Sequence, residues 1–259
     1  MPPIVAVVSA EDAVKKAACG HVVLDARGHR QRGLRFLRGA ARVPWTDTRT
    51  GGARSGRLAD PAELARVFSQ AGVSWGHPVL VVGAGRAGWG EGARVAWTLA
   101  WLDHPSVSWC PLSGEWPRWP RLSTPDSPVD WPGTVRKGLR PPADWGPGPV
   151  CRVLDVREAD EFAGARRYGE ARGGHVPGAV SLPLPELWAA WSAGALPDRL
   201  ARAGVGENDP VVTICTGGVR SAAAALLIAD GGHQGEVLHD ERGMWAWSAD
   251  PSRPMATVD

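Results

Sequence analysis

Short runs of apolar residues recur along this chain of 259 residues and alternate with longer stretches in which polar and apolar positions mix. The runs at 22–24, 79–82, 153–156 and 211–214 are rich in valine, leucine and isoleucine. Runs of this length are typical of strands that are buried on both faces of a parallel sheet. The pattern therefore predicts a buried strand at each of these four places.

Helical segments are expected between the predicted strands. One begins at Asp60-Pro61-Ala62-Glu63, where an acidic N-cap precedes a proline at the first helical position, and ends at Gly72. Helices are also predicted over 93–102 and 220–229, the second of which is closed by Gly231-Gly232. Alternating strands and helices predict an α/β fold, with a mostly parallel sheet flanked by helices on both faces.

The chain carries a diverged internal repeat. Four short motifs occur twice in the same order, at 23–27 and 153–157, 39–44 and 178–183, 71–79 and 203–211, and 114–116 and 243–245. The two copies of the third motif are 132 residues apart, and carrying that spacing forward places Gly83 opposite Cys215. We therefore expect two tandem domains of one architecture, of which only the second has a cysteine at this position.

Proline recurs throughout residues 120–149, at a density that resists both helix and sheet. We interpret this stretch as a linker between the two copies. The expected organisation is a first domain at 1–120, a linker at 121–149 and a second domain at 150–259.

Composition and charge disfavour several classes of function. The net charge is +2, and no cluster of lysine and arginine interleaves with aromatic residues, so nucleic acid is not an expected partner. Cys19, Cys110, Cys151 and Cys215 are far apart and form no CxxC pair, so neither a zinc site nor a disulfide framework is expected. Residues 1–8 lack the basic start of a signal peptide, and no run is long enough for a membrane span. No membrane association is expected, and the cytoplasm is the expected location.

Cys215 is the residue whose surroundings most clearly indicate chemistry. It follows the strand at 211–214 and opens the segment Cys215-Thr216-Gly217-Gly218-Val219-Arg220-Ser221, which leads into a predicted helix. On such a turn several backbone N–H groups and the positive end of a helix can face one anion. The glycines leave room for a ligand, Arg220 adds a positive charge, and Ser221 is the expected helix N-cap. Most free cysteines are buried and inert, but this setting predicts a reactive thiolate.

The loop and three further motifs resemble those of rhodanese-type sulfurtransferases. They are Cys215-x-x-Gly218-x-Arg220-Ser221, Leu154-Asp155-Val156-Arg157 followed by Glu161-Phe162, His175-Val176-Pro177-Gly178-Ala179, and Gly243-Met244-Trp245-Ala246-Trp247. The first half carries weaker versions at 24–27, 38–40 and 114–116. The resemblance implies two tandem rhodanese-like domains, the first inactive and the second catalytic.

The resemblance also implies a double displacement that requires no metal or organic cofactor. The Cys215 thiolate would take the outer sulfur of thiosulfate or 3-mercaptopyruvate as a persulfide, and cyanide, a thiol or a thioredoxin-like protein would then remove it. Backbone N–H groups of the loop would stabilise the charge on the sulfur. The implied catalytic residue is Cys215, and the implied substrate-binding residues are Thr216, Gly217, Gly218, Val219, Arg220 and Ser221.

The identity of the sulfur donor is left open by the residues around these motifs. Tandem enzymes of this family usually have a substrate-binding arginine where this chain has Glu161. The neutral residues after Cys215 favour 3-mercaptopyruvate, whereas Arg220 stands where enzymes of that type usually have threonine. The candidates for the missing positive charge are Arg166, Arg167 and Arg172. The residues interpreted as structural, rather than as catalytic acid or base, are Asp155, Arg157 and His175.

Two other functions are compatible with the sequence. Cysteine phosphatases and arsenate reductases of related fold usually place five residues between cysteine and arginine, around a tetrahedral oxyanion. Here four residues separate Cys215 from Arg220, and the shorter loop favours a single sulfur atom. A persulfide carrier or regulatory module would use the same loop as the enzyme, and steady-state turnover of small donors distinguishes the two.

Overall fold

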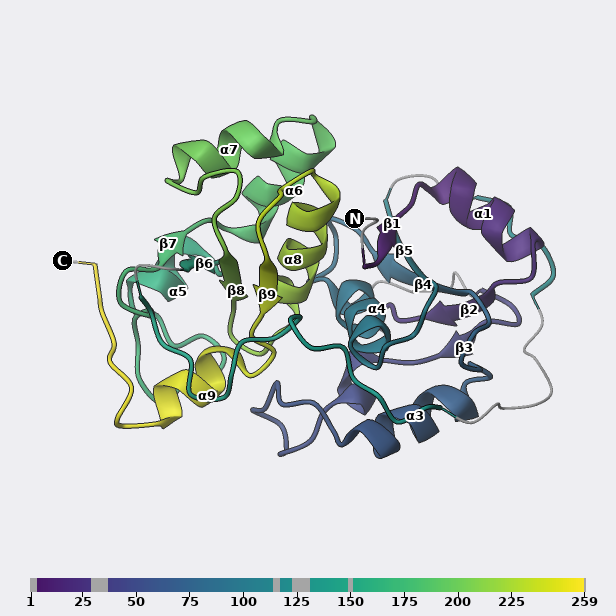
Figure 1. The fold of residues 1–259 in the computed structure, drawn as a ribbon, viewed down its shortest axis with the longest axis horizontal. Helices are drawn as coiled ribbons and strands as arrows, with labels where there is room; N and C mark the ends of the chain where they lie inside the picture. The colour runs from purple at the N-terminus through teal and green to yellow at the C-terminus, as the bar shows by residue number, and fades with distance from the viewer. Residues whose placement is uncertain (1–3, 29–36, 114–116, 123–130, 149–150, 259) are drawn as a thin grey trace. The chain divides into compact units, whose positions relative to one another are not determined.

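The computed structural model describes residues 4–28, 37–113, 117–122, 131–148 and 151–258, and Figure 1 shows the course of the chain. The chain divides into two compact units. The first comprises Met1–Arg49 and Ala59–Lys137, and the second comprises Thr50–Leu58 and Gly138–Asp259. The repeated motif at 114–116 and part of the proline-rich stretch lie outside the described residues.

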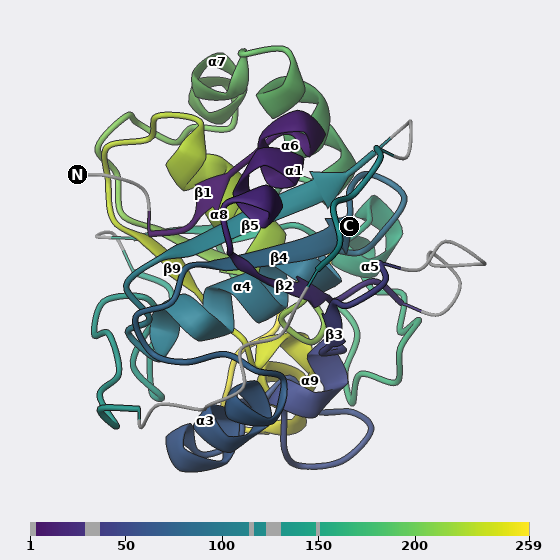
Figure 2. The same cartoon turned by 90° about the vertical axis from the view of Figure 1, so that its right-hand side faces the viewer.

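The first unit is built on a five-stranded parallel sheet with the strand order β1-β5-β4-β2-β3. Its strands are β1 (Ala6–Val7), β2 (Val22–Asp25), β3 (Ala41–Arg42), β4 (Val79–Ala84) and β5 (Val107–Leu112). Its helices are α1 (Ala10–Ala18), the short 3-10 helix η1 (Trp45–Thr48), α3 (Pro61–Gln70) and α4 (Glu91–Trp101). Figure 2 shows α1 on one side of this sheet and α3 and α4 on the other, so the central strands β2 and β4 are buried on both faces.

The helices of the first unit follow the local chemistry of the sequence. Asp60 caps α3, because its side chain accepts the backbone N–H of Ala62 at 2.9 Å, and the helix ends shortly before Gly72, whose φ is +79°. Helix α4 begins slightly earlier than the pattern predicted and is buried along its whole length, including Trp97 and Trp101. These two tryptophans therefore belong to the core.

The second unit is built on a four-stranded parallel sheet with the strand order β7-β6-β8-β9. Its strands are β6 (Arg152–Asp155), β7 (Val180–Ser181), β8 (Val211–Ile214) and β9 (Val237–His239). Its helices are α5 (Ala159–Ala163), α6 (Leu184–Ser192), α7 (Leu196–Arg202), α8 (Arg220–Asp230) and α9 (Gly243–Ala249). The α/β architecture expected for each half, a parallel sheet flanked by helices, is confirmed.

The strand registers confirm the internal repeat. In the first unit β2 pairs with β4 from Val22↔Val79 to Asp25↔Val82. In the second unit β6 pairs with β8 from Arg152↔Val211 to Asp155↔Ile214. The spacing read from the sequence therefore superposes β4 on β8 residue by residue, and Gly83 occupies the position that Cys215 has in the second unit.

The first unit has no space for a side chain at this position. A Cβ on Gly83 would lie 2.8 Å from Gly92 Cα and 3.1 Å from Trp109 Nε1. Contacts this short with backbone cannot be relieved by moving a flexible side chain. The first unit therefore keeps the strand and the helix of the repeat, but its tight packing at Gly83 excludes a thiol.

Candidate active site

The Cys215 loop lies at the carboxyl end of β8, directly before α8, where parallel α/β sheets place their ligand sites. Cys215 is buried, with 1% of its surface exposed. The backbone N–H of Gly218 and the hydroxyl of Ser221 each donate a hydrogen bond to Cys215 Sγ at 3.2 Å. Hydrogen bonds to an ionised acceptor are stronger than those to a neutral one. Two donors therefore converge on the sulfur, where they would stabilise a negative charge.

Ser221 does not have the role that the sequence predicted for it. The N-cap of α8 is Val219, and the helix begins at Arg220, which places Ser221 inside the first turn. Its hydroxyl is turned to the sulfur of Cys215 instead of capping a backbone N–H. The interpretation of Ser221 as the N-cap was therefore wrong, because position in the first turn lets the side chain reach the cysteine.

Helix α9 sets the orientation of the loop backbone. The N–H groups of Met244 and Trp245 donate to the carbonyl oxygens of Cys215 and Thr216 at 2.8 and 3.0 Å. In a planar trans peptide the carbonyl and the next N–H point in opposite directions. The N–H groups of Thr216 and Gly217 are consequently directed away from α9, which keeps them available to an anion.

Two glycines of the loop are required by its geometry. A Cβ on Gly217 would overlap the ring of Trp245, whose Nε1 donates to the carbonyl of Tyr168 at 3.0 Å. Gly218 has a φ of +78°, a left-handed conformation that side chains disfavour. The tight turn around the sulfur therefore depends on glycine at both positions.

A buried ion pair fixes the side chain of Arg220. Arg220 Nη1 donates to Glu161 Oε2 at 2.6 Å, and Nη2 donates to Glu161 Oε1 at 2.8 Å. The Arg220 and Glu161 side chains are 9% and 0% exposed. Thr216 joins the pair, because its hydroxyl lies 3.0 Å from both Glu161 Oε1 and Arg220 Nη2 and 3.3 Å from Glu170 Oε1. The guanidinium also lies 5.6 Å from the centre of the Tyr168 ring.

Glu161 and Arg220 each stabilise the charged form of the other. Burial alone would raise the pKa of Glu161, but the hydrogen bonds and charge of Arg220 outweigh it and hold that pKa below its ordinary value. Burial alone would lower the pKa of Arg220, but the bonds to Glu161 and the negative charge of Cys215 raise it. Arg220 therefore stays charged and stays directed at Glu161.

Glu161 is the residue beside the loop whose partner the sequence did not reveal. The sequence identified it only as a replacement for an expected substrate arginine. In the structure it also forms part of a capping box at the start of α5, where the N–H of Glu158 donates to its Oε2 at 3.1 Å. The sequence does contain one hint of this ion pair: the negatively charged Glu161 and the positively charged Arg220 both lie in motifs of the second domain.

The residues interpreted as structural have structural surroundings. Arg157 pairs with the buried carboxylate of Asp155 and donates to the carbonyl of Gly174 at 2.8 Å. His175 Nδ1 lies 2.9 Å from the carbonyl of Phe162, and the two rings are stacked at 3.6 Å. These contacts hold the segments that flank the loop.

The three arginines considered as sources of missing charge are engaged elsewhere in the second unit. Arg166 donates to the carbonyl of Glu170 at 2.7 Å, and Arg167 forms an ion pair with Asp160. Arg172 donates to the carbonyls of Trp247, Ser248, Asp250 and Arg253, which ties the segment after α5 to the end of the chain.

A segment from the first half of the sequence lies against the loop as part of the second unit. Thr50–Leu58 is folded on itself, since the N–H of Thr50 donates to the carbonyl of Arg57 at 2.9 Å. A Cβ on Gly56 would lie 2.6 Å from the carbonyl oxygen of Gly217 and would overlap that of Glu241. The exposed side chain of Arg54 lies beside Gly169. No sequence pattern indicated that this segment belongs with the cysteine.

The other cysteines differ from Cys215 in their surroundings. All four are free thiols, and burial raises the pKa of Cys110 to about 12. Among the described residues, no group of three or more His, Cys, Asp or Glu side chains is arranged to hold a metal ion. In the same part of the chain, no helix is both long and apolar enough to cross a membrane.

Comparison with known proteins gives a family match for the part of the chain that holds the Cys215 loop. Residues 144–250, which contain the Cys215 loop, match the rhodanese-like domain. The fold of nearly the whole chain matches that of Tum1 from Saccharomyces cerevisiae, with a TM-score of 0.76 over 99% of this chain and 100% of the other at 16% identity. The second unit thus contains a match to the rhodanese-like domain, and the chain as a whole has the fold of Tum1.

Two further matches show how far the likeness extends. This chain also has the fold of 3-mercaptopyruvate sulfurtransferase from Leishmania major, with a TM-score of 0.67 and 20% identity over 93% of this chain and 73% of the other. It is also 32% identical over 108 residues to a Mycobacterium tuberculosis protein named "Putative thiosulfate sulfurtransferase SseB". That match covers 40% of this chain and 37% of the relative. The two structural likenesses show a shared fold.

Proposed function

We propose that this protein is a sulfurtransferase that moves a sulfane sulfur from an anionic donor to a thiophilic acceptor through a persulfide on Cys215. The observation that carries the proposal is the pair of hydrogen bonds that Gly218 and Ser221 donate to Cys215 Sγ, both at 3.2 Å. The names of the relatives, which include a thiosulfate and a 3-mercaptopyruvate sulfurtransferase, support the same reaction class.

The reaction consists of two displacements at sulfur. In the first, the Cys215 thiolate attacks the outer sulfur of the donor, an S–S bond forms, and the bond that held this sulfur breaks. With thiosulfate the leaving group is sulfite, which departs with the electron pair. In the second, the acceptor attacks the outer sulfur of the persulfide, and the electron pair of the S–S bond returns to Cys215 as the thiolate. Cyanide as the acceptor leaves as thiocyanate.

The loop supplies fixed dipoles rather than a proton relay. Negative charge lies on the sulfur at the start, in the persulfide and at the end, so donors that are already aligned need not reorganise during the reaction. We assign Cys215 as the catalytic residue, and Gly218 and Ser221 as direct contacts of the sulfur. The backbone N–H groups of Thr216, Gly217, Val219 and Arg220 complete the proposed substrate-binding loop.

The ion pair of Arg220 disfavours the phosphatase alternative. A loop that holds a tetrahedral oxyanion needs its arginine to face the ligand, where the guanidinium binds two oxygens. Here both Nη atoms of Arg220 are bonded to Glu161 in the interior. The loop is therefore better suited to one sulfur atom than to a phosphate or arsenate group.

The anionic group of the donor requires a positive charge from outside the loop. Arg220 is neutralised by Glu161, and Arg166, Arg167 and Arg172 are bonded to other groups. Arg54, in the segment that contacts the loop at Gly56, is the arginine that we assign to this role. Thiosulfate and 3-mercaptopyruvate both carry the required negative charge.

The proposal is tested by intact-mass spectrometry after incubation with each donor separately. We expect the chain to gain the mass of one sulfur atom, to lose it on addition of cyanide, and to gain nothing in Cys215→Ser. Cys110→Ser is the matched control and should behave as the unmodified chain. An adduct that survives in Cys215→Ser would contradict the assignment.

Steady-state measurements separate the enzyme from a dedicated carrier. An enzyme turns over many donor molecules with cyanide or a small thiol as the acceptor. A carrier gives the mass adduct once and no further turnover with any small acceptor, and that result would favour the carrier alternative.

A further inference from the structure

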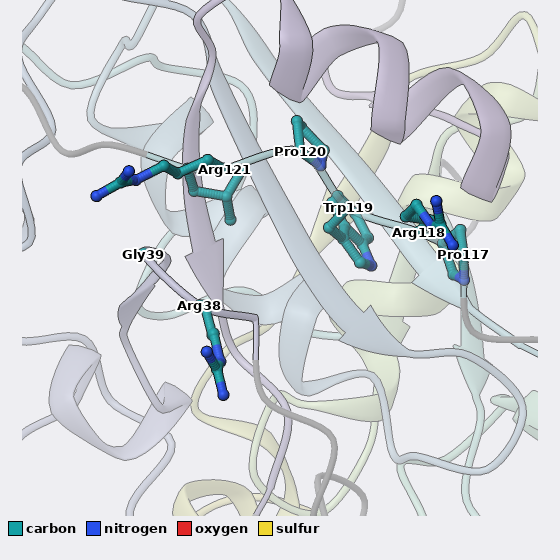
Figure 3. Close-up of a pocket in the computed structure, with 8 residues that line it drawn as sticks. Arg38, Gly39, Pro117, Arg118, Trp119, Pro120 and Arg121 are labelled. Carbon is teal, nitrogen blue, oxygen red and sulfur yellow. The ribbon is translucent and has the colours of Figure 1, made fainter.

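A cavity of about 900 Å³ in the first unit has Arg38 and residues 117–122 in its lining. Figure 3 shows that the side chains of Arg38, Arg118 and Arg121 point away from one another, so they do not converge on one ligand. Trp119, which also lines the cavity, packs against the core of this unit. We therefore assign no ligand to this cavity.

The last part of the proline-rich stretch forms a strap on the second unit. The strap consists of residues 139–145, and it is bonded to residues 239–242, the connector that leads from β9 to α9. The backbone N–H of His239, the first residue of the connector, donates to the first carbonyl of the strap at 2.9 Å. Arg242, the last residue of the connector, donates to two more carbonyls of the strap at 2.9 and 3.2 Å, those of Ala143 and Pro142. The strap therefore holds both ends of the connector.

Side chains add two more contacts between the strap and the connector. Trp145 Nε1 donates to Asp240 Oδ2 at 2.8 Å, and Arg140 Nη2 lies 2.8 Å from Glu241 Oε1. The side chains of Asp240 and Glu241 are 4% and 0% exposed. A buried carboxylate that loses a partner is destabilised, because water cannot replace the lost bond. Each of the four connector residues therefore has a partner in the strap, and two of these contacts are to buried carboxylates.

The connector continues directly into the part of α9 that holds the Cys215 loop. The N–H groups of Met244 and Trp245 donate to the carbonyl oxygens of Cys215 and Thr216 at 2.8 and 3.0 Å. Gly243 has a φ of +62°, and a Cβ on it would lie 2.5 Å from each of these two oxygens. The start of α9 is thus in direct backbone contact with the loop. A displacement of the connector would rotate the loop peptides, and with them the N–H groups on their opposite side.

We propose that the strap positions the Cys215 loop for sulfur transfer. It fixes the connector, the connector fixes the start of α9, and α9 holds the loop carbonyls so that the opposing N–H groups stay available to the sulfur. Trp145 and Arg140 are positioning residues, because they act through the connector and α9. This role rests on the proposed sulfur transfer, in which fixed loop dipoles stabilise the charge on the sulfur.

Removing one hydrogen bond of the strap tests this role. Trp145→Phe loses the Nε1 donor but keeps an aromatic ring beside Trp247, whose ring centre is 5.1 Å away. Trp191→Phe is the matched control, because Trp191 Nε1 donates to Asp230 Oδ2 at 2.9 Å in the same unit, at the end of α8 that is far from the loop. Melting curves establish that both variants are folded at the assay temperature.

The first measurement is the rate of persulfide formation, followed by rapid quenching and intact-mass spectrometry with whichever of thiosulfate and 3-mercaptopyruvate gives the adduct. In Trp145→Phe we expect the rate constant at saturating donor to fall about tenfold, because small displacements of catalytic groups slow a reaction strongly. The donor concentration that gives half of this rate should be unchanged, since the strap does not supply the charge that binds the donor. Trp191→Phe should leave both quantities unchanged.

The second measurement is hydrogen exchange of the peptide that contains Met244 and Trp245. Their N–H groups should exchange faster in Trp145→Phe than in the unmodified chain or in Trp191→Phe, because the start of α9 is less firmly held. Arg140→Gln, which removes the pair with Glu241, should give the same pattern and carries the test if Trp145→Phe does not fold. The two substitutions combined should slow the reaction less than the product of their single effects, since both release the same connector.

Four outcomes would contradict the proposal. An unchanged rate in Trp145→Phe and Arg140→Gln, even with faster exchange, would show that the strap is only structural. An equal loss of rate in Trp191→Phe would show a general effect of losing an indole donor. A lower rate without faster exchange at the start of α9 would refute the route through the connector. An unmodified chain that forms no persulfide with either donor would refute the proposed function itself, and this result is seen before any variant is compared.

Discussion

Replacing Glu161 with glutamine isolates the charge of the ion pair beside Cys215. The substitution keeps the shape of the side chain but removes one of the two acceptors that Arg220 uses at 2.6 and 2.8 Å. It leaves a guanidinium with 9% of its side chain exposed opposite a neutral amide. Breaking a buried pair from one side costs about 3 kcal/mol, because the remaining charge stays away from water.

Native-state hydrogen exchange of peptides from β8 and α8 measures this loss in the unit concerned. A free energy of unfolding lower by about 3 kcal/mol corresponds to exchange that is roughly 150-fold faster. Glu186→Gln is the control, because Glu186 pairs with Arg199 at 2.6 Å on the surface, where the side chains are 51% and 28% exposed. Such a pair contributes at most about 1 kcal/mol. If Glu161→Gln speeds exchange no more than Glu186→Gln does, the reasoning about the buried pair is refuted.

The same variant gives a prediction about acid. Because the folded-state pKa of Glu161 lies below its ordinary value of 4.5, the stability from its ionisation is fully present above that value. It is lost as the pH falls through the folded-state pKa. The difference in stability between the natural chain and Glu161→Gln should therefore be constant near neutral pH and shrink as the pH falls below 4.5.

Three further predictions concern single residues. Gly217→Ala should lower the free energy of unfolding by about 1–3 kcal/mol and impair sulfur transfer, because the added Cβ overlaps the ring of Trp245. Thermal melts and turnover that both match the unmodified chain would contradict this packing. Cys110, whose pKa is raised to about 12, should resist iodoacetamide at pH 8 in the folded chain while the exposed Cys19 reacts, as peptide mass spectrometry can show. Labelling of Cys110 at the rate found in urea would count against its burial. Arg54→Ala should raise the KM for thiosulfate and for 3-mercaptopyruvate severalfold with little change in kcat, and an unchanged KM would remove Arg54 from the donor site.

Local sequence determined the elements on which the site stands. The buried strands at β2, β4, β6 and β8 follow from short apolar runs, and the Asp60 cap of α3 follows from residues that are adjacent in the chain. The position of Cys215 between a strand and a helix is local in the same sense. The repeat spacing in the sequence also placed Gly83 opposite Cys215, and the structure agrees because both copies have the same strand register.

Tertiary structure decided how the side chains around the sulfur are used. Glu161 and Arg220 are 59 residues apart, and their pairing depends on where α5 and α8 end up in the fold, which periodicity does not encode. The hydroxyl of Ser221 suits an N-cap by residue type, but the start of α8 at Arg220 directs it to Cys215. The segment Thr50–Leu58 joins the second unit although it lies within the first half of the sequence. The sequence by itself thus determined the elements and the thiol, because these depend on neighbouring residues. The partners of the thiol loop required the fold, because contacts between distant segments depend on the path of the whole chain.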